Sequence, residues 1–139
     1  MGLFAFLQPR KSYRATTAVA RTLSKQEKLA VTVAMQLVVN RYGRRPVFPQ
    51  ETKYIQAIQK RVLRLDEKDV AALRVTTFNP FSILGAMPEG DKRYFAAVFY
   101  ELATLVADQA VVGRASVVIR DLGFSMTDLS NQTAFLAYR

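Results

Sequence analysis

The sequence predicts an all-α fold: a compact single-domain bundle of about five to six helices around two apolar central helices. Apolar residues recur at the helical spacings of three and four from residue 24 onward. Hydrophobic residues make up 50% of the chain and charged residues 22%, a balance that is typical of globular proteins. A chain of 139 residues can also bury one core without disulfides or a metal ion. We therefore expect one helical domain over residues 24–139, preceded by a mobile basic extension over residues 1–23.

The extension begins with a short apolar patch that is followed by cations. These residues are, in order, Leu3, Phe4, Phe6 and Leu7, and then Arg10, Lys11 and Arg14. A secretory signal has the opposite order, with its positive charge ahead of a longer apolar run. We expect the patch to pack on its own domain or on a partner, and an interfacial membrane anchor is the alternative.

The first predicted helix runs from Ser24 to about Asn40. Ser24 and Glu27 have the spacing of a capping box, in which the two side chains bond the free amides at a helix start. The helix is apolar on three sides, which is typical of a central core helix. Its apolar run, from Leu29 to Val39, is far shorter than the roughly 20 residues that cross a bilayer.

The second helix is predicted over residues 50–65, because Pro49 fits the first turn of a helix. Its expected buried face is formed by Tyr54, Ile55, Ile58, Val62 and Leu65, and its outer face by Lys53, Gln56, Lys60 and Arg64. A short third helix is predicted from Asp66 to about residue 75, with acidic residues in its first turn, where they complement the helix dipole.

Residues 76–91 read as a connector, since prolines and glycines interrupt them. The connector is apolar for a loop, with Phe78, Phe81 and Leu84 among its residues. We expect it to pack over the core as a lid, and a partner-binding surface is the alternative. A fourth helix, the second central one, is predicted from residue 91 to about 108, followed by shorter helices over 113–122 and 126–137.

Positive charge is concentrated in the first half of the chain. Residues 1–65 contain thirteen of the 20 Lys and Arg residues but only two of the 11 acidic ones. Such a field indicates a docking surface for an anionic partner. The candidate anion-binding residues are Arg10, Lys11, Arg14, Arg41, Arg44, Arg45, Lys53, Lys60 and Arg64. The candidate hydrophobic partner contacts are Leu3, Phe4, Phe6, Leu7, Phe78, Phe81 and Leu84.

Composition excludes most familiar catalytic chemistry. The chain has no Cys and no His, which removes thiolate nucleophiles, zinc sites that depend on these ligands, and Ser-His-Asp triads. Glu101 and Asp108 are seven residues apart and would share a helix face, with Asp121 near them. These carboxylates could form a general acid-base pair, or an Mg²⁺ or Ca²⁺ site with oxygen ligands only, and both remain alternatives. We favour pairing of these acids with Arg93, Arg114 and Arg120, and predict a non-enzymatic protein without cofactor or metal.

An internal duplication is suggested by Val62-Leu63-Arg64, which recurs as Val118-Ile119-Arg120. With this helix order, residues 27–129 resemble the TerB-like family of all-helical domains of tellurite-resistance and other stress-response proteins. In that family, acids after the core helices are associated with metal binding. Here the matching positions hold Asn40, Gly43 and Glu51 in the first half, and Asp108-Gln109 and Arg114 in the second. The resemblance therefore implies the fold and a stress-response role, but no metal site.

The function that these patterns favour is a cytoplasmic, helical interaction or scaffold module that acts in a larger assembly. A protein partner or self-association is expected, with the basic half docking on an acidic protein or an anionic membrane surface. The alternative is a nucleic-acid-binding protein that uses the basic cluster at residues 41–64. No helix-turn-helix pattern or aromatic stacking array is recognisable, so such binding would be directed to the phosphate backbone. No small-molecule substrate is expected.

Overall fold

A computed structural model describes residues 14–15, 22–40, 46–72 and 79–134. Its helices are α2 (Lys25–Val39), α3 (Pro49–Ala57), α4 (Glu67–Ala72), α5 (Pro80–Gly85), α6 (Glu89–Thr104), α7 (Gln109–Asp121) and α8 (Met126–Leu129). Two strands of two residues each, β1 (Arg14–Ala15) and β2 (Gln132–Thr133), form one parallel pair. The predicted all-α fold is confirmed.

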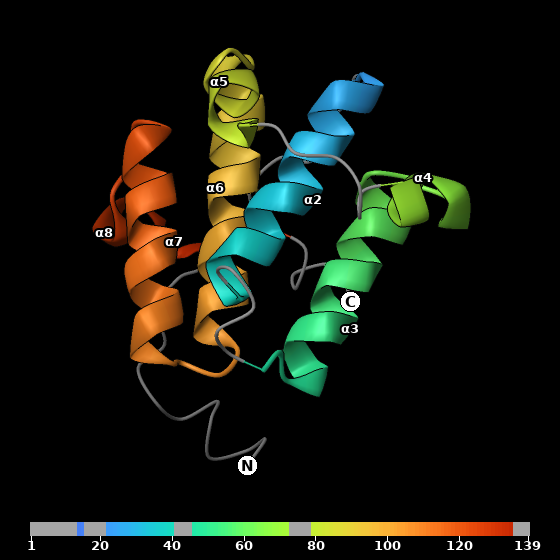
Figure 1. Cartoon of the computed structure of the whole chain (residues 1–139). Coiled ribbons are helices and arrows are strands. Elements are labelled where there is room, and N and C mark those ends of the chain that lie inside the picture. Colours follow the sequence, from blue (N-terminus) through green and yellow to red (C-terminus); the bar gives the residue numbers. More distant parts are fainter. Residues whose placement is uncertain (1–13, 16–21, 41–45, 73–78, 135–139) are drawn as a thin grey trace.

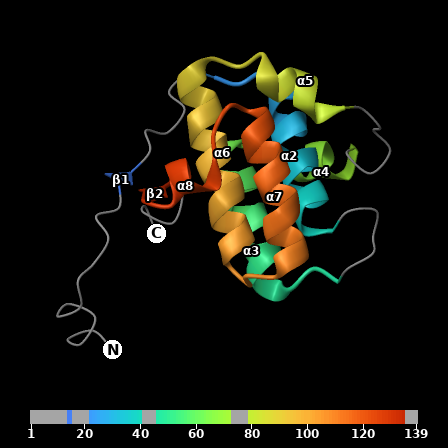
Figure 2. The ribbon, with the colours of Figure 1, turned by 90° about the vertical axis from the view of Figure 1, so that its left-hand side faces the viewer.

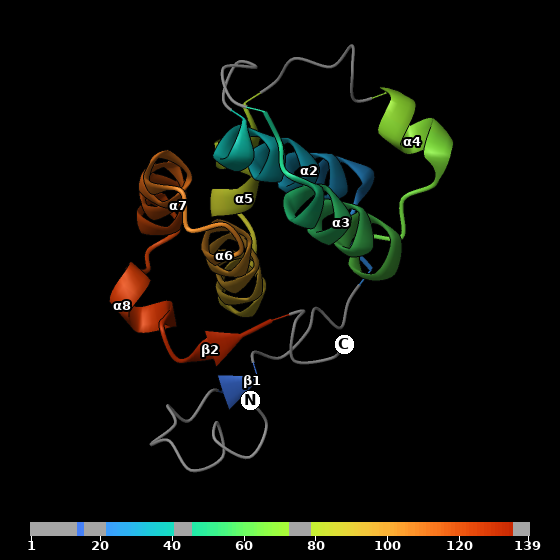
Figure 3. The ribbon, with the colours of Figure 1, turned by 90° about the horizontal axis from the view of Figure 1, so that it is seen from below.

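The bundle is built around α2 and α6, as the sequence predicted. Figures 1 and 3 show α7, α6, α2 and α3 in succession, with α5 across one end and α4 at the outer edge beside α3. Helix α2 contacts α3, α5, α6 and α7, and α6 contacts α2, α3, α7, α8 and β2. The apolar faces of these two helices consequently supply much of the core, including Met35 and Phe99, which are fully buried.

Short-range capping explains where several helices begin. Ser24 Oγ accepts a hydrogen bond from Glu27 N at 3.1 Å, and Ser24 N donates to Glu27 Oε1 at 2.8 Å, as the predicted capping box requires. Asp66 and Asp69 bond each other's backbone amides in the same way before α4. Leu23, just ahead of the first cap, is buried in the core.

The second predicted helix differs from expectation in its last turns. After α3 the chain continues as a π-helical turn, Ile58–Val62, in which Leu63 N donates to Ile58 O, five residues back, at 2.9 Å. This wider turn shifts the inward face by one residue. Leu63 is fully buried, whereas the predicted core residues Val62 and Leu65 are only half-buried.

The connector prediction over residues 76–91 was wrong in part, because α5 lies inside it. Asn79 caps this helix by accepting a hydrogen bond from Phe81 N at 2.9 Å, and Pro80 occupies its first turn. Residues 73–78 lie outside the described residues. The lid interpretation holds for α5, since Leu84 is fully buried and Phe81 packs half-buried against the core.

The last three helices also have different limits from those predicted. Helix α6 ends at Thr104 instead of residue 108, and Ala107 adopts a positive φ of 60° between α6 and α7. Helix α7 begins at Gln109, four residues earlier than expected. Helix α8 ends at Leu129, and the chain then forms β2, which lies beside β1 in Figure 2.

Candidate functional site

The described part of the predicted basic surface lies on the outer side of α3 and its π-helical turn. Lys53, Lys60 and Arg64 are all exposed. Arg64 follows the π-helical turn in the left-handed conformation, with φ of 54°, and Leu65 N then donates to Gln59 O at 2.9 Å. This short reversal keeps Arg64 at the surface between the turn and α4. We define Lys53, Lys60 and Arg64 as the cationic face.

Most of the other predicted cations lie outside the described residues. Arg10, Lys11, Arg41, Arg44 and Arg45 lie outside the described residues, and Arg14 is described only through its backbone pairing in β1. All 11 acidic residues but only twelve of the 20 Lys and Arg residues are in the described segments. The described residues are therefore almost neutral in sum. The excess positive charge of the chain is carried by residues outside them.

The predicted hydrophobic contacts are partly corrected. Leu84 is fully buried in the core, so it cannot offer a surface to a partner in this structure. Phe81 is half-buried against the core, and Leu3, Phe4, Phe6, Leu7 and Phe78 lie outside the described residues. Large apolar side chains that are exposed include Phe48, at 40%, and Val117, at 46%. Sequence reasoning missed both. Phe48 lies just before a helix, and Val117 lies beside other apolar residues within a helix, so neither is distinctive in the sequence.

The carboxylates considered for catalysis are not brought together. Glu101 lies inside α6, whereas Asp108 is the N-cap of α7 and accepts hydrogen bonds from Ala110 N and Val111 N at 2.9 and 3.2 Å. The prediction that these two share a helix face was wrong, because α6 ends between them. Asp121 is exposed at the last residue of α7.

Glu101 instead forms a buried cluster with Tyr54 and the chain after β2. Tyr54 Oη donates to Glu101 Oε1, and Ala134 N donates to Glu101 Oε2 at 2.6 Å. All three residues are buried. Burial, with the nearby Glu101 carboxylate, raises the pKa of the Tyr54 hydroxyl well above its usual value. Tyr54 therefore remains a proton donor, and the cluster connects α3, α6 and the segment after β2.

A second long-range polar contact fixes the C-terminal end of α2. Arg114 on α7 donates from Nε to Val38 O at 2.8 Å and from a terminal nitrogen to Val39 O at 3.3 Å. Carbonyl groups in the last turn of a helix have no partner within the helix, and a cation there also complements the helix dipole. The sequence predicted an acidic partner for Arg114, but its guanidinium binds these carbonyls.

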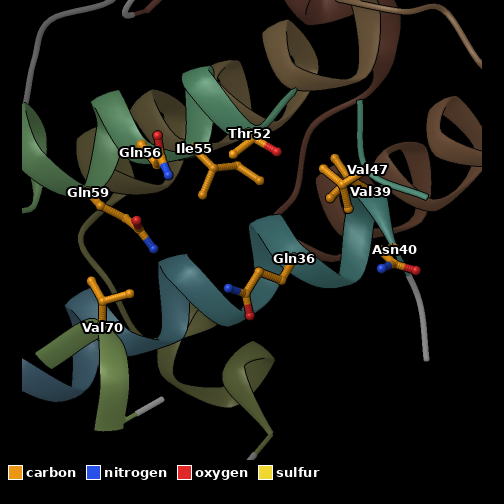
Figure 4. Close-up of a pocket in the computed structure, with 9 residues that line it drawn as sticks. All are labelled: Gln36, Val39, Asn40, Val47, Thr52, Ile55, Gln56, Gln59 and Val70. Carbon is orange, nitrogen blue, oxygen red and sulfur yellow. The ribbon is translucent and has the colours of Figure 1, made fainter. Parts of the chain in front are cut away.

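A groove with a polar lining lies between α2 and α3. Its main hollow, of about 390 Å³, is lined by Gln36, Val39, Asn40, Val47, Thr52, Ile55, Gln56, Gln59 and Val70. Figure 4 shows these side chains along α2 and just after it, along α3 and the residues before and after it, and, for Val70, on α4. The polar ones are carboxamides and one hydroxyl, so none of these side chains is charged. The sequence analysis missed this groove, because neutral polar residues on a helix surface give no distinctive pattern.

The described segments contain no group of three or more His, Cys, Asp and Glu side chains that could hold a metal ion. Within the same segments, none of the helices has the length and hydrophobicity needed to cross a bilayer.

In comparisons with known proteins, no family model, no curated protein and no solved structure matches the chain. The TerB-like resemblance consequently stays a prediction.

Proposed function

We propose that this protein is a non-enzymatic helical interaction module, which works in the cytoplasm within a larger assembly and docks on an acidic protein. The observation that carries the proposal is the cationic face. Lys53 on α3, Lys60 in the π-helical turn and Arg64 just after it are all exposed, whereas the acid of α3, Glu51, is fully buried. Outward positive charge is thus not balanced by an exposed acid on the same helix.

The location of two ion pairs supports this proposal. Within the described residues, ion pairs join Lys25 to Asp69 at 3.7 Å and Lys92 to Glu89 at 3.9 Å. Neither pair includes a residue of the cationic face. Solvated cations of this kind guide association and select a partner of opposite charge, although each contributes little affinity alone.

The position of Arg41, Arg44 and Arg45 in the sequence adds to the proposal. These residues are joined to the bundle through Asn40 and Pro46, at the ends of a segment between α2 and α3. The sequence therefore carries three further cations shortly before the start of α3. Phe48, exposed at the start of α3, adds an apolar contact of the kind that anchors protein interfaces.

A charge-reversal experiment tests the proposal. The intact chain is titrated with poly-L-glutamate, duplex DNA and phosphatidylserine vesicles at several salt concentrations. One double variant, Lys53→Glu with Lys60→Glu, reverses two charges of the cationic face. The control double variant, Lys68→Glu with Arg120→Glu, reverses exposed cations of α4 and α7 and so changes the net charge by the same amount. We expect the first variant to weaken poly-L-glutamate binding about tenfold more than the second.

Two results would contradict the proposal. Equal losses in the two variants would show that only the net charge matters. If binding to DNA were tighter than to poly-L-glutamate at equal salt, and were weakened selectively by Lys53→Glu with Lys60→Glu, the nucleic-acid alternative would replace it.

A further inference from the structure

A hollow adjoins the cationic face where the π-helical turn leads into α4. Its volume is about 560 Å³, and it is lined by Gln56, Gln59, Lys60, Leu65, Asp66, Glu67, Val70 and Ala71. Figure 1 shows α4 beside the end of α3. Unlike the groove between α2 and α3, this hollow has charged residues in its lining. Lys60 belongs both to this lining and to the cationic face, so a partner on that face would also reach the hollow.

The apolar part of the hollow comes from side chains that the core leaves partly uncovered. Because the π-helical turn shifts the inward face by one residue, Leu63 enters the core and Leu65 remains half-buried. Arg64, with φ of 54°, reverses the chain between them. Val70 is also half-buried, and Ala71 is exposed. An apolar side chain of a partner that covered this surface would therefore gain free energy from burial.

The surroundings of the hollow carry a net positive charge. Residues 53–71 contain five exposed cations but two exposed acids, Asp66 and Glu67. The third acid, Asp69, is half-buried and forms an ion pair with Lys25 at 3.7 Å. Asp66 Oδ1 accepts a hydrogen bond from Asp69 N at 2.8 Å, and Glu67 lies in the first turn of α4, so both exposed acids stabilise the start of that helix. The excess of cations consequently favours a partner with acidic residues.

We propose that the cationic face binds an acidic segment of a partner protein that contains a leucine-sized apolar residue, and that this residue enters the hollow. Acidic residues on either side of it would lie near Lys53, Lys60 and Arg64. Its side chain would contact Leu65 and Val70. The inference rests on the proposed function and names the kind of acidic sequence that the cationic face selects. Charge would guide the segment to the surface, and burial of the apolar residue would fix its position.

Three nine-residue peptides, titrated into the intact chain by calorimetry at low salt, test this combination of charge and apolar contact. The first has a leucine between two runs of four glutamates. The second has a serine in place of that leucine, and the third has the leucine between two runs of four serines. We expect the first to bind about tenfold more tightly than either of the others, because only it supplies both contacts. The methyl signals of Val70 in the NMR spectrum should shift with the first peptide and not with the second.

Substitutions in the chain locate the leucine. Ala71→Gln puts a long neutral side chain into the hollow without changing the charge. It should reduce the preference for leucine over serine to less than about twofold and leave binding of the serine peptide unchanged. Ala110→Gln is the matched control at an exposed alanine of α7, and should retain the full preference. Lys53→Glu, which lies outside the hollow, should weaken both acidic peptides equally. A dispersed NMR spectrum shows that each variant is folded.

The outcomes separate this inference from the proposed function. Equal binding of the two acidic peptides, with both weakened by Lys53→Glu, would overturn the inference and leave the proposed function standing. Failure of both acidic peptides to bind would remove the two together. The inference is also wrong if Ala71→Gln retains the preference for leucine, or if the leucine peptide with serines binds as tightly as the one with glutamates. Shifts of the Val70 methyl signals with protein concentration alone would identify a second copy of the chain as the occupant instead.

Discussion

Replacing Arg114 by Met tests how the C-terminal end of α2 is held. The guanidinium of Arg114 donates to Val38 O at 2.8 Å and to Val39 O at 3.3 Å, where these carbonyls have no partner within the helix. Met keeps an unbranched aliphatic stem of similar length but has no donor. The substitution therefore removes the hydrogen bonds and the positive charge while it preserves much of the packing between α7 and α2.

The expected loss follows from these contacts. A hydrogen bond with a charged partner contributes about 1.5 to 3 kcal/mol, and the second contact is long enough to contribute less than the first. Loss of a cation at a helix end adds about 0.3 to 1 kcal/mol. We expect Arg114→Met to lower the free energy of unfolding by about 3 kcal/mol. With a urea dependence of about 2 kcal/mol per molar, the unfolding midpoint would fall by about 1.5 M.

Urea titration followed by circular dichroism measures this change. Arg120→Met is the matched control, since Arg120 is an exposed residue of the same helix and should change stability by less than about 0.5 kcal/mol. Arg114→Lys should show a loss intermediate between these, because one ammonium cannot reproduce the two-pronged contact. If Arg114→Met and Arg120→Met had equal midpoints, the carbonyl contacts would not stabilise the fold and our reasoning would be refuted.

Three further substitutions test other parts of the structure. Leu84→Ala should cost about 3 kcal/mol in urea unfolding, because it leaves a cavity beneath α5; a cost under 1 kcal/mol would mean that α5 is not part of the core. Ser24→Ala should cost about 1 kcal/mol in the same assay by removing the cap of α2, and an unchanged midpoint would contradict this. Tyr54→Phe should reduce the loss of unfolding free energy that occurs as the pH rises above about 10. Above pH about 10 the unfolded chain loses the Tyr54 proton while the folded chain retains it, so stability falls with rising pH by up to about 1.4 kcal/mol per unit. Urea titrations from pH 9 to 11 measure that slope, and an equal slope in Tyr54→Phe and the natural chain would contradict the prediction.

Local chemistry made much of the fold predictable. Ser24 with Glu27 and Asp66 with Asp69 form reciprocal caps of the expected kind, because these bonds involve residues only three apart. The apolar periodicity likewise identified α2 and α6 as the central helices. Asn79-Pro80 also carries a helix-start signal, but the surrounding prolines and glycines obscured it and α5 was read as connector.

Features set by tertiary contacts were not predictable. Ala107 reverses the chain between α6 and α7 in a conformation for which alanine gives no signal, so Asp108 was placed on the wrong helix. The partners of Arg114 and Glu101 are backbone groups far away in the sequence, and a backbone group has no identity that a sequence pattern can reveal. The groove was missed for a related reason: its glutamines become distinctive only when Gln59 is seen to be buried.

The π-helical turn at Ile58–Val62 bears on how this chain tolerates changes in length. A hydrogen bond that spans five residues instead of four accommodates one residue more than an α-helix would need between Ile58 and Leu63. Deletion of the exposed Lys60 would therefore let the same two residues bond as a regular α-helix, with both still facing the core. A deletion inside a helix normally rotates the residues after it away from the core. At this position it would restore ordinary helical geometry instead, and the main structural change would be in the wall of the groove.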